Sequence, residues 1–192
     1  MNELDDYSGP YKPDFKLEDL SKDALIKLWQ STCRLLIGID GHWYNQVKDR
    51  VGLDEAFKIN NQVWIDMVPR EKRWVMDLMK MNVTGDDVAT LFKFQQLNPA
   101  TAGIMEIDLQ LENPNKGTMT VTKCSVLESC EKLGLDRRQR DCCDMDVQYF
   151  ANQAREVNPN IKTKCLKLPP RKSKDEIACK WEFTLEPEKA KS

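Results

Sequence analysis

The sequence lacks the motifs by which most nucleotide-dependent and hydrolytic enzymes are recognised. It contains no Gly-x-Gly-x-x-Gly, no Walker lysine loop, no Gly-x-Ser-x-Gly elbow and no His-Glu-x-x-His pair. Histidine occurs once, at His42. A Ser-His-Asp or Cys-His arrangement would have to use that residue, and a metal site can include at most one imidazole. ATP, dinucleotide, serine-esterase and zinc-protease functions therefore lack their usual support.

The chain also has little of what membrane or nucleic-acid partners require. No apolar run approaches the ~18 residues of a transmembrane helix, and residues 1–13 are acidic and polar, unlike a signal peptide. Lys and Arg number 29 against 31 Asp and Glu, for a net charge of −2, so the basic excess of a nucleic-acid-binding protein is missing. We therefore expect a cytoplasmic protein, in which seven cysteines are free thiols by default.

Hydrophobic spacing changes along the chain from a helical period to a strand period. Ser21 is a plausible N-cap for a helix whose apolar stripe is Leu25, Leu28, Trp29, Thr32, Leu35 and Leu36. After about residue 98 the apolar residues alternate instead, as in Met105, Ile107, Leu109 and Leu111. The pattern predicts an α+β fold: a helical N-terminal half, then an antiparallel sheet of about four strands (hairpin, helices, hairpin) with helices packed on one face.

The same pattern predicts three segments. Residues 1–17 are expected to form a flexible N-terminal arm, residues 18–98 a helical part, and residues 99–187 an α+β, ligand-binding-like part. We expect the last two segments to form one domain.

Three residues are expected to break the helices of the N-terminal half. Gly38 and Gly41 are predicted to interrupt or bend the first long helix, and Pro69 to begin a new or kinked helix. Most tryptophans and methionines fall on helical stripes or on the inner face of the sheet. We therefore expect them in the core rather than around a ligand.

Cysteines of the C-terminal half fall at or near the ends of predicted elements, where they can converge on one pocket. The second hairpin places Cys165 and Cys179 on one buried face, because side chains alternate with period 2 along a strand. Cys33 and Cys130 lie on helical stripes and are expected only to pack. The candidate ligand-binding set is Cys124, Cys143, Cys165 and Cys179, with Cys142 as the alternative to its neighbour.

Cys142 and Cys143 are also the candidate nucleophiles. If Asp141 caps the helix that follows, both thiols lie in its first turn, where the helix dipole lowers a thiol pKa. His42 is then the only imidazole available as a base, and it lies in the helical half.

A metal site is the less favoured use of the same thiols. Zinc or iron would be held by Cys124, Cys143, Cys165 and Cys179, yet no two cysteines have the Cys-x2–4-Cys spacing that structural zinc sites usually include. The cofactor therefore stays unknown, with zinc or iron as the alternatives.

A loose set of residues carries a family resemblance: Asp40 to Trp43, Gly52, Val63-Trp64, Cys124, Gly134, Cys142-Cys143, Pro159, Cys165 with Pro169-Pro170, and Cys179 to Phe183. Over about residues 25–185 the chain resembles a little-characterised family of prokaryotic cytosolic proteins. That family is similar to the L-2-amino-thiazoline-4-carboxylic acid hydrolase family and, more distantly, to vinyl-reductase-type small-molecule-binding domains. The resemblance implies an α+β ligand-binding fold in which cysteines line a cavity.

The hydrolase-family pattern matches this sequence at few positions. They are Cys124, Cys143 with Asp146, and Cys179 with Phe183. Cys165 and the Pro169-Pro170 loop instead resemble the uncharacterised relatives.

Three function hypotheses follow. The leading one is a cytosolic domain that binds a small ligand, or a metal, in a cysteine-lined pocket. The second is a hydrolase of a small cyclic amide or thiazoline-like C–N bond with a cysteine nucleophile, and the third is a structural or interaction protein whose thiols only pack. The expected partner is a small molecule, with no nucleic acid and no membrane, and a homodimer is left open.

Overall fold

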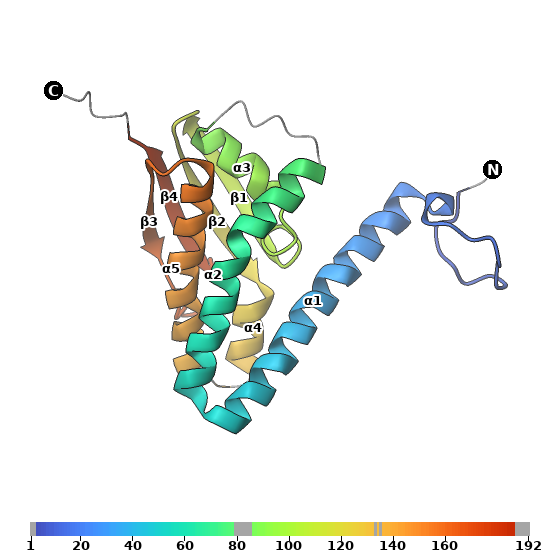
Figure 1. The fold of residues 1–192 in the computed structure, drawn as a ribbon, viewed down its shortest axis with the longest axis horizontal. Helices are drawn as coiled ribbons and strands as arrows, with labels where there is room; N and C mark the ends of the chain where they lie inside the picture. Colours follow the sequence, from blue (N-terminus) through green and yellow to red (C-terminus); the bar gives the residue numbers. More distant parts are fainter. Residues whose placement is uncertain (1–2, 79–85, 133, 135, 187–192) are drawn as a thin grey trace.

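The computed structural model describes residues 3–78, 86–132, 134 and 136–186, and within this part the side chains of residues 136–143 are excluded. A layer of helices packs on a four-stranded sheet (Figure 1). One long helix, residues 22–51, projects from this body. This arrangement confirms the predicted α+β class. No described helix is long and apolar enough to span a bilayer.

The first two helices form an antiparallel hairpin. Helix α1 (Lys22–Val51) begins at Ser21, whose Oγ accepts a hydrogen bond from the Ala24 N–H at 3.3 Å, which confirms the predicted N-cap. It ends at Gly52, which has φ of 88°, a conformation that glycine adopts readily. Helix α2 (Leu53–Leu78) then returns along the body (Figure 1). A 3-10 turn, η1 (Leu17–Asp19), precedes α1.

The predicted interruptions of these helices are wrong, while the alternatives, a bend at Gly38 and Gly41 and a kink at Pro69, stay predictions. Helix α1 continues through Gly38 and Gly41, because one helical glycine costs only about 1 kcal/mol relative to alanine. Helix α2 continues through Pro69, which lies on the exposed side. Trp64 and Glu71, on either side of this proline, both contact Tyr149 of helix α5 (Asp136–Val157). These contacts stabilise α2 where Pro69 has no backbone N–H to donate.

The sheet consists of two hairpins joined side by side. Strands β1 (Met105–Asn113) and β2 (Lys116–Cys124) form the first, and β3 (Ile161–Lys167) and β4 (Cys179–Leu185) form the second. All pairings are antiparallel and the spatial order is β1-β2-β4-β3. The number of strands and the hairpin order match the prediction from period-2 spacing.

Helices cover one face of this sheet (Figure 1). They are α3 (Val88–Leu97), α4 (Ser125–Lys132) and α5 (Asp136–Val157), with α2 packed on α5. Phe92 of α3 meets Phe183 edge-on at 5.8 Å, and Phe150 of α5 meets Trp181 at 5.1 Å between ring centroids. Aromatic pairs therefore join the helical layer to β4.

The prediction that Cys165 and Cys179 share the buried face of the second hairpin is confirmed. Cys165 is paired with Trp181, which lies two residues along β4 from Cys179 and so on the same face. Cys179 is buried, and Cys165 is half-buried against the core. Cys33 and Cys130 are buried as well, as expected of packing thiols.

The expected burial of the tryptophans holds for Trp181 of the sheet and in part for Trp64, which packs against the core. Trp181 is fully buried, whereas Trp29, Trp43 and Trp74 of the helical hairpin are 40%, 62% and 54% exposed. Their helical spacing indicates an apolar face correctly, but α1 projects beyond the body and leaves most of that face uncovered (Figure 1).

A close approach at Gly103 holds α1 against the body. A Cβ at this position would overlap Sγ of Cys33 on α1 and the carbonyl oxygen of Pro99. A Cβ at Gly38, within α1, would meet nothing. The two glycines therefore offer a matched pair of substitutions.

We expect Gly103→Ala to lower the free energy of unfolding by about 2 kcal/mol through overpacking. Gly38→Ala should raise it by about 0.5–1 kcal/mol through helix propensity. Urea denaturation of both variants measures the difference. Equal stability of the two variants would contradict the close contact between α1 and the loop before β1.

Candidate functional site

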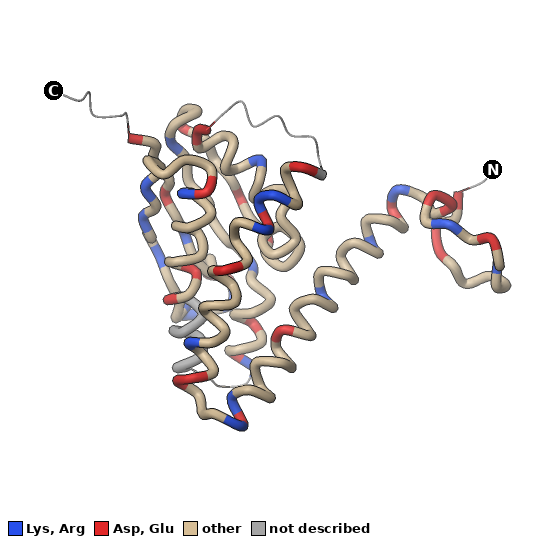
Figure 2. The backbone as a smooth tube through the Cα atoms, viewed as in Figure 1, with Lys and Arg blue, Asp and Glu red and all other residues tan. Residues whose placement is uncertain are grey.

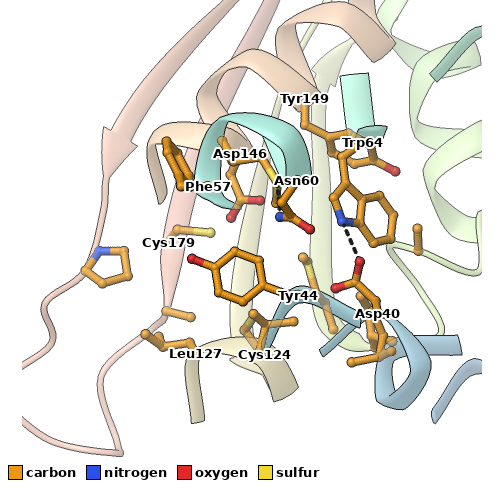
Figure 3. A pocket seen from close by; sticks show the side chains of 18 residues that line it. Asp40, Tyr44, Phe57, Asn60, Trp64, Cys124, Leu127, Asp146, Tyr149 and Cys179 are labelled. Atoms are coloured by element: carbon orange, nitrogen blue, oxygen red, sulfur yellow. Dashed lines mark hydrogen bonds between the residues drawn. The ribbon is translucent and has the colours of Figure 1, made fainter. Parts of the chain in front are cut away.

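A pocket lies where the α1–α2 hairpin, α4, α5 and the sheet meet (Figure 3). Its cavity volume is about 70 Å³. We call it the Asp146 pocket. Its lining includes Asp40, Tyr44, Phe57, Asn60, Trp64, Cys124, Leu127, Asp146, Tyr149 and Cys179.

The lining is acidic and aromatic. It contains two carboxyl groups, on Asp40 and Asp146, while none of the described lining residues is Lys, Arg or His. The remaining lining is largely apolar, apart from Asn60, two thiols and four aromatic residues: Tyr44, Phe57, Trp64 and Tyr149.

Asp146 of α5 is the most unusual of these residues. Its carboxyl group, the hydroxyl of Tyr44 and the sulfur of Cys179 point toward one another across the pocket (Figure 3). Burial raises the pKa of Asp146 to about 7, and no described hydrogen bond or cation acts in the opposite direction. Near neutral pH the protonated and ionised forms of this carboxyl group are therefore both populated, and its acceptor capacity is directed into the pocket.

Asp40 is held differently. Its Oδ1 accepts a hydrogen bond from Nε1 of Trp64 at 3.1 Å, and this bond joins α1 to α2 (Figure 3). The Trp64 ring in turn meets the Tyr149 ring at 90° with centroids 6.0 Å apart. One side of the pocket is thus a continuous polar and aromatic wall from α1 through α2 to α5.

The buried carboxyl group of Glu71 lies outside the pocket and fixes the position of Tyr149 in this wall. Oε2 of Glu71 accepts hydrogen bonds from the Tyr149 hydroxyl at 2.6 Å, from Asn98 Nδ2 at 3.1 Å and from Gln153 Nε2 at 3.4 Å. Burial raises the pKa of Glu71, although these hydrogen bonds act to lower it. Glu71 fixes the orientation of Tyr149 and does not itself line the pocket.

The structure brings two of the predicted cysteines to the pocket. Cys124, at the end of β2, and Cys179, at the start of β4, line it, whereas Cys165 lies outside its lining. Burial raises the pKa of Cys124 to about 12 and also raises the pKa of Cys179 and of Cys165. All three groups are therefore neutral thiols at pH 7, which act as small apolar surfaces rather than as nucleophiles.

The predicted position of Cys142 and Cys143 at a helix start is wrong. Helix α5 begins at Asp136, six residues before Cys142, so both residues lie beyond its first turn and Asp141 is not its N-cap. The Arg- and Gln-rich stretch before Asp141 favours helix and extends α5 backwards. The side chains of Cys142 and Cys143 lie outside the described part, and their proposed roles stay predictions.

His42 lies away from the Asp146 pocket. It is exposed on α1, in a separate groove of about 350 Å³ shared with Ser125 and Ser129 of α4. The structure does not bring it together with Cys124 or Cys179. Among the described side chains, no three His, Cys, Asp or Glu residues are close enough to hold a metal ion.

Spacing assigned none of the acidic and aromatic residues to the site, and the family resemblance includes Asp40, Trp64 and Asp146 without giving them a role. Asp146 lies on the same helical stripe as Tyr149, Phe150 and Gln153, at spacings of three, four and seven residues, and the latter three are buried. A carboxyl group on a stripe of otherwise buried residues was the sequence feature that could have indicated Asp146 as a site residue. That Asp146 lies beside α1 and α2 depends on the tertiary fold.

Fold and site together define an α+β domain with a small acidic, aromatic-lined pocket. The model of DUF6125, a family of unknown function, matches residues 17–185, and the chain belongs to that family. No curated protein matches the chain, and no solved structure does.

Replacing the pocket carboxyl group should change how stability depends on pH. The folded pKa of Asp146, about 7, exceeds the ordinary value of about 3.9. Between these values the folded chain keeps a proton that the unfolded chain releases, so this group makes stability fall as pH rises from about 4 to about 7. Asp146→Asn removes that loss.

We expect Asp146→Asn to be more stable than the wild type by about 1–3 kcal/mol at pH 8, and equal to it near pH 4. Urea denaturation at several pH values measures this difference. The matched control is Asp144→Asn, on the exposed side of the same helix. A difference that does not grow with pH would contradict the raised pKa.

Proposed function

We propose that the chain is a small-ligand-binding domain and that the Asp146 pocket binds a small organic cation, such as an amine. The observation that carries this proposal is the composition of the lining: two carboxyl groups and four aromatic residues, with no basic residue among the described ones. An ammonium group is attracted both by a carboxylate and by the faces of aromatic rings.

The two carboxyl groups have different roles in this proposal. Asp40 already accepts a hydrogen bond from Trp64, which fixes the position of its carboxyl group and that of the indole. Asp146 has its acceptor capacity directed into the pocket (Figure 3). It therefore pairs with the ligand's ammonium group, while Tyr44 and the aromatic wall contact the rest of the ligand.

The cysteines have a supporting part in this proposal. Cys124 and Cys179 remain neutral because burial raises the pKa of both thiols, and they contribute apolar surface to the pocket. The alternative function, a hydrolase of a small cyclic C–N bond, needs a thiolate. None of the described pocket thiols supplies one, so that hypothesis, like the resemblance behind it, stays a prediction that depends on Cys142 and Cys143.

The proposal also places the protein in the cytoplasm. Five described cysteines are free thiols: Cys33, Cys124, Cys130, Cys165 and Cys179. Free thiols are the usual state in a reducing compartment.

Three probes of similar size separate the proposed charge preference from simple apolar binding. Benzylamine, benzyl alcohol and benzoate carry a cation, a neutral group and an anion on the same ring. We expect benzylamine to bind in calorimetry and to raise the melting temperature, and benzoate to do neither. Binding of benzylamine should strengthen as pH rises through about 7, because Asp146 becomes ionised while the amine stays protonated.

Asp146→Asn should weaken benzylamine binding by about 10- to 100-fold, as expected for the loss of one buried ion pair. Asp144→Asn should leave it unchanged. Tighter binding of benzoate than of benzylamine would contradict the cation preference. Failure of all three probes to bind, together with an unaltered melting temperature, would count against the pocket as a site for ligands of this size.

A further inference from the structure

Helix α1 projects from the body for much of its length. It has 30 residues, which corresponds to about 45 Å, and packs mainly against α2 through its C-terminal half (Figure 1). The N-terminal half diverges from α2 and ends at the segment before Ser21, far from the sheet (Figure 1). An isolated helical half of this length has little stability in water without tertiary contacts.

The uncovered face of α1 has the spacing of a coiled-coil seam. We call it the α1 stripe, and it consists of Leu25, Trp29, Thr32, Leu36, Ile39 and Trp43, at alternating intervals of four and three residues. Each of its five large apolar side chains is between 38% and 62% exposed. A repeat of four and three residues places side chains along one seam, which is the pattern by which one helix packs on another.

Four residues of the α1 stripe line one wall of an apolar groove: Trp29, Leu36, Ile39 and Trp43. The opposite wall comes from α2, with Val63, Met67 and Trp74, and the end of the groove from the loop after α3. The groove has a volume of about 760 Å³, about ten times the volume of the Asp146 pocket. Its walls are two helices, so an additional helix can pack against both by the same seam geometry.

We propose that a second copy of this chain occupies the groove, with the α1 helix of each copy packed in the groove of the other. A two-fold arrangement is self-complementary: each copy contributes one projecting helix and one groove. The occupant must be an apolar helix with a seam matching the α1 stripe, and α1 of a second copy has that seam. Few positions along the projecting half of α1 are charged, and most of its tube is tan in Figure 2. By helical spacing, Lys27 and Arg34 lie on the side of α1 opposite the stripe.

The exposed area is sufficient for a stable dimer. Eight large apolar side chains of the α1 stripe and of the groove are between 38% and 62% exposed: Leu25, Trp29, Leu36, Ile39, Trp43, Val63, Trp74 and Leu97. With ~150–200 Å² for a fully exposed large apolar side chain, they present roughly 600–800 Å² per copy. A standard stable interface buries about 800 Å² per partner, and a monomer seldom exposes so large an apolar patch.

Sedimentation velocity on the full chain tests the proposal. We expect the wild type to have the mass of two chains at about 10 µM. Ile39→Glu and, independently, Leu36→Glu should weaken association at least about 100-fold and give the mass of one chain, because each places a charge at the centre of the seam. Gln30→Glu, on the opposite exposed side of α1, is the matched control and should remain a dimer.

Hydrogen exchange separates association from folding. The amides of residues 25–39 should be protected in the wild type and exchange faster in Ile39→Glu and on dilution, while those of the sheet stay unchanged. A wild type that is monomeric at about 100 µM, glutamate variants that stay dimeric, or an equal effect of Gln30→Glu would each overturn the proposal. A wild-type monomer whose α1 stripe becomes protected only with another protein would assign the groove to a different partner.

Discussion

The hydrogen bonds received by the buried Glu71 carboxyl group hold the helical layer together. They connect α2 to α5 through Tyr149 and Gln153, and to the loop after α3 through Asn98. A buried carboxyl group is costly unless several donors satisfy it, so these residues specify one arrangement of the helices. The position of Tyr149, and with it one wall of the Asp146 pocket, depends on this arrangement.

The Asp40–Trp64 hydrogen bond extends the same wall to α1. Asp40, Trp64 and Ala100 line the Asp146 pocket on one side and the α1–α2 groove on the other. The proposed ligand site and the proposed dimer contact are therefore separated by a single layer of side chains. A partner helix in the groove would pack against the same indole that closes the pocket, and would fix the angle between α1 and α2.

Local patterns predicted much of the fold. Period-2 alternation was sufficient for four strands and for the shared face of Cys165 and Cys179, and Ser21 was sufficient for the start of α1. Patterns failed where tertiary packing outweighs local preference. Helix α2 tolerates Pro69 because contacts on both sides fix it. Trp29, Trp43 and Trp74 are exposed although their spacing indicates a buried face.

The candidate site was only partly predictable for the same reason. Cys124 and Cys179 were found because each lies at an end of a predicted strand, while the pairing of β2 with β4 that brings the two ends together comes from the structure. Asp40, Tyr44 and Asp146 belong to helices whose mutual packing has no local signature. Burial leaves the described pocket thiols neutral and makes the Asp146 carboxyl group the group of the pocket that titrates near neutral pH.

The most direct test of this account is the pKa of Asp146 itself, followed by the ¹³C chemical shift of its carboxyl carbon during NMR titration, with and without benzylamine. The account predicts a midpoint near 7 in the free protein and a lower midpoint with benzylamine, because a bound cation stabilises the carboxylate. A midpoint near the ordinary value of about 3.9, or one that benzylamine leaves unchanged, would contradict it.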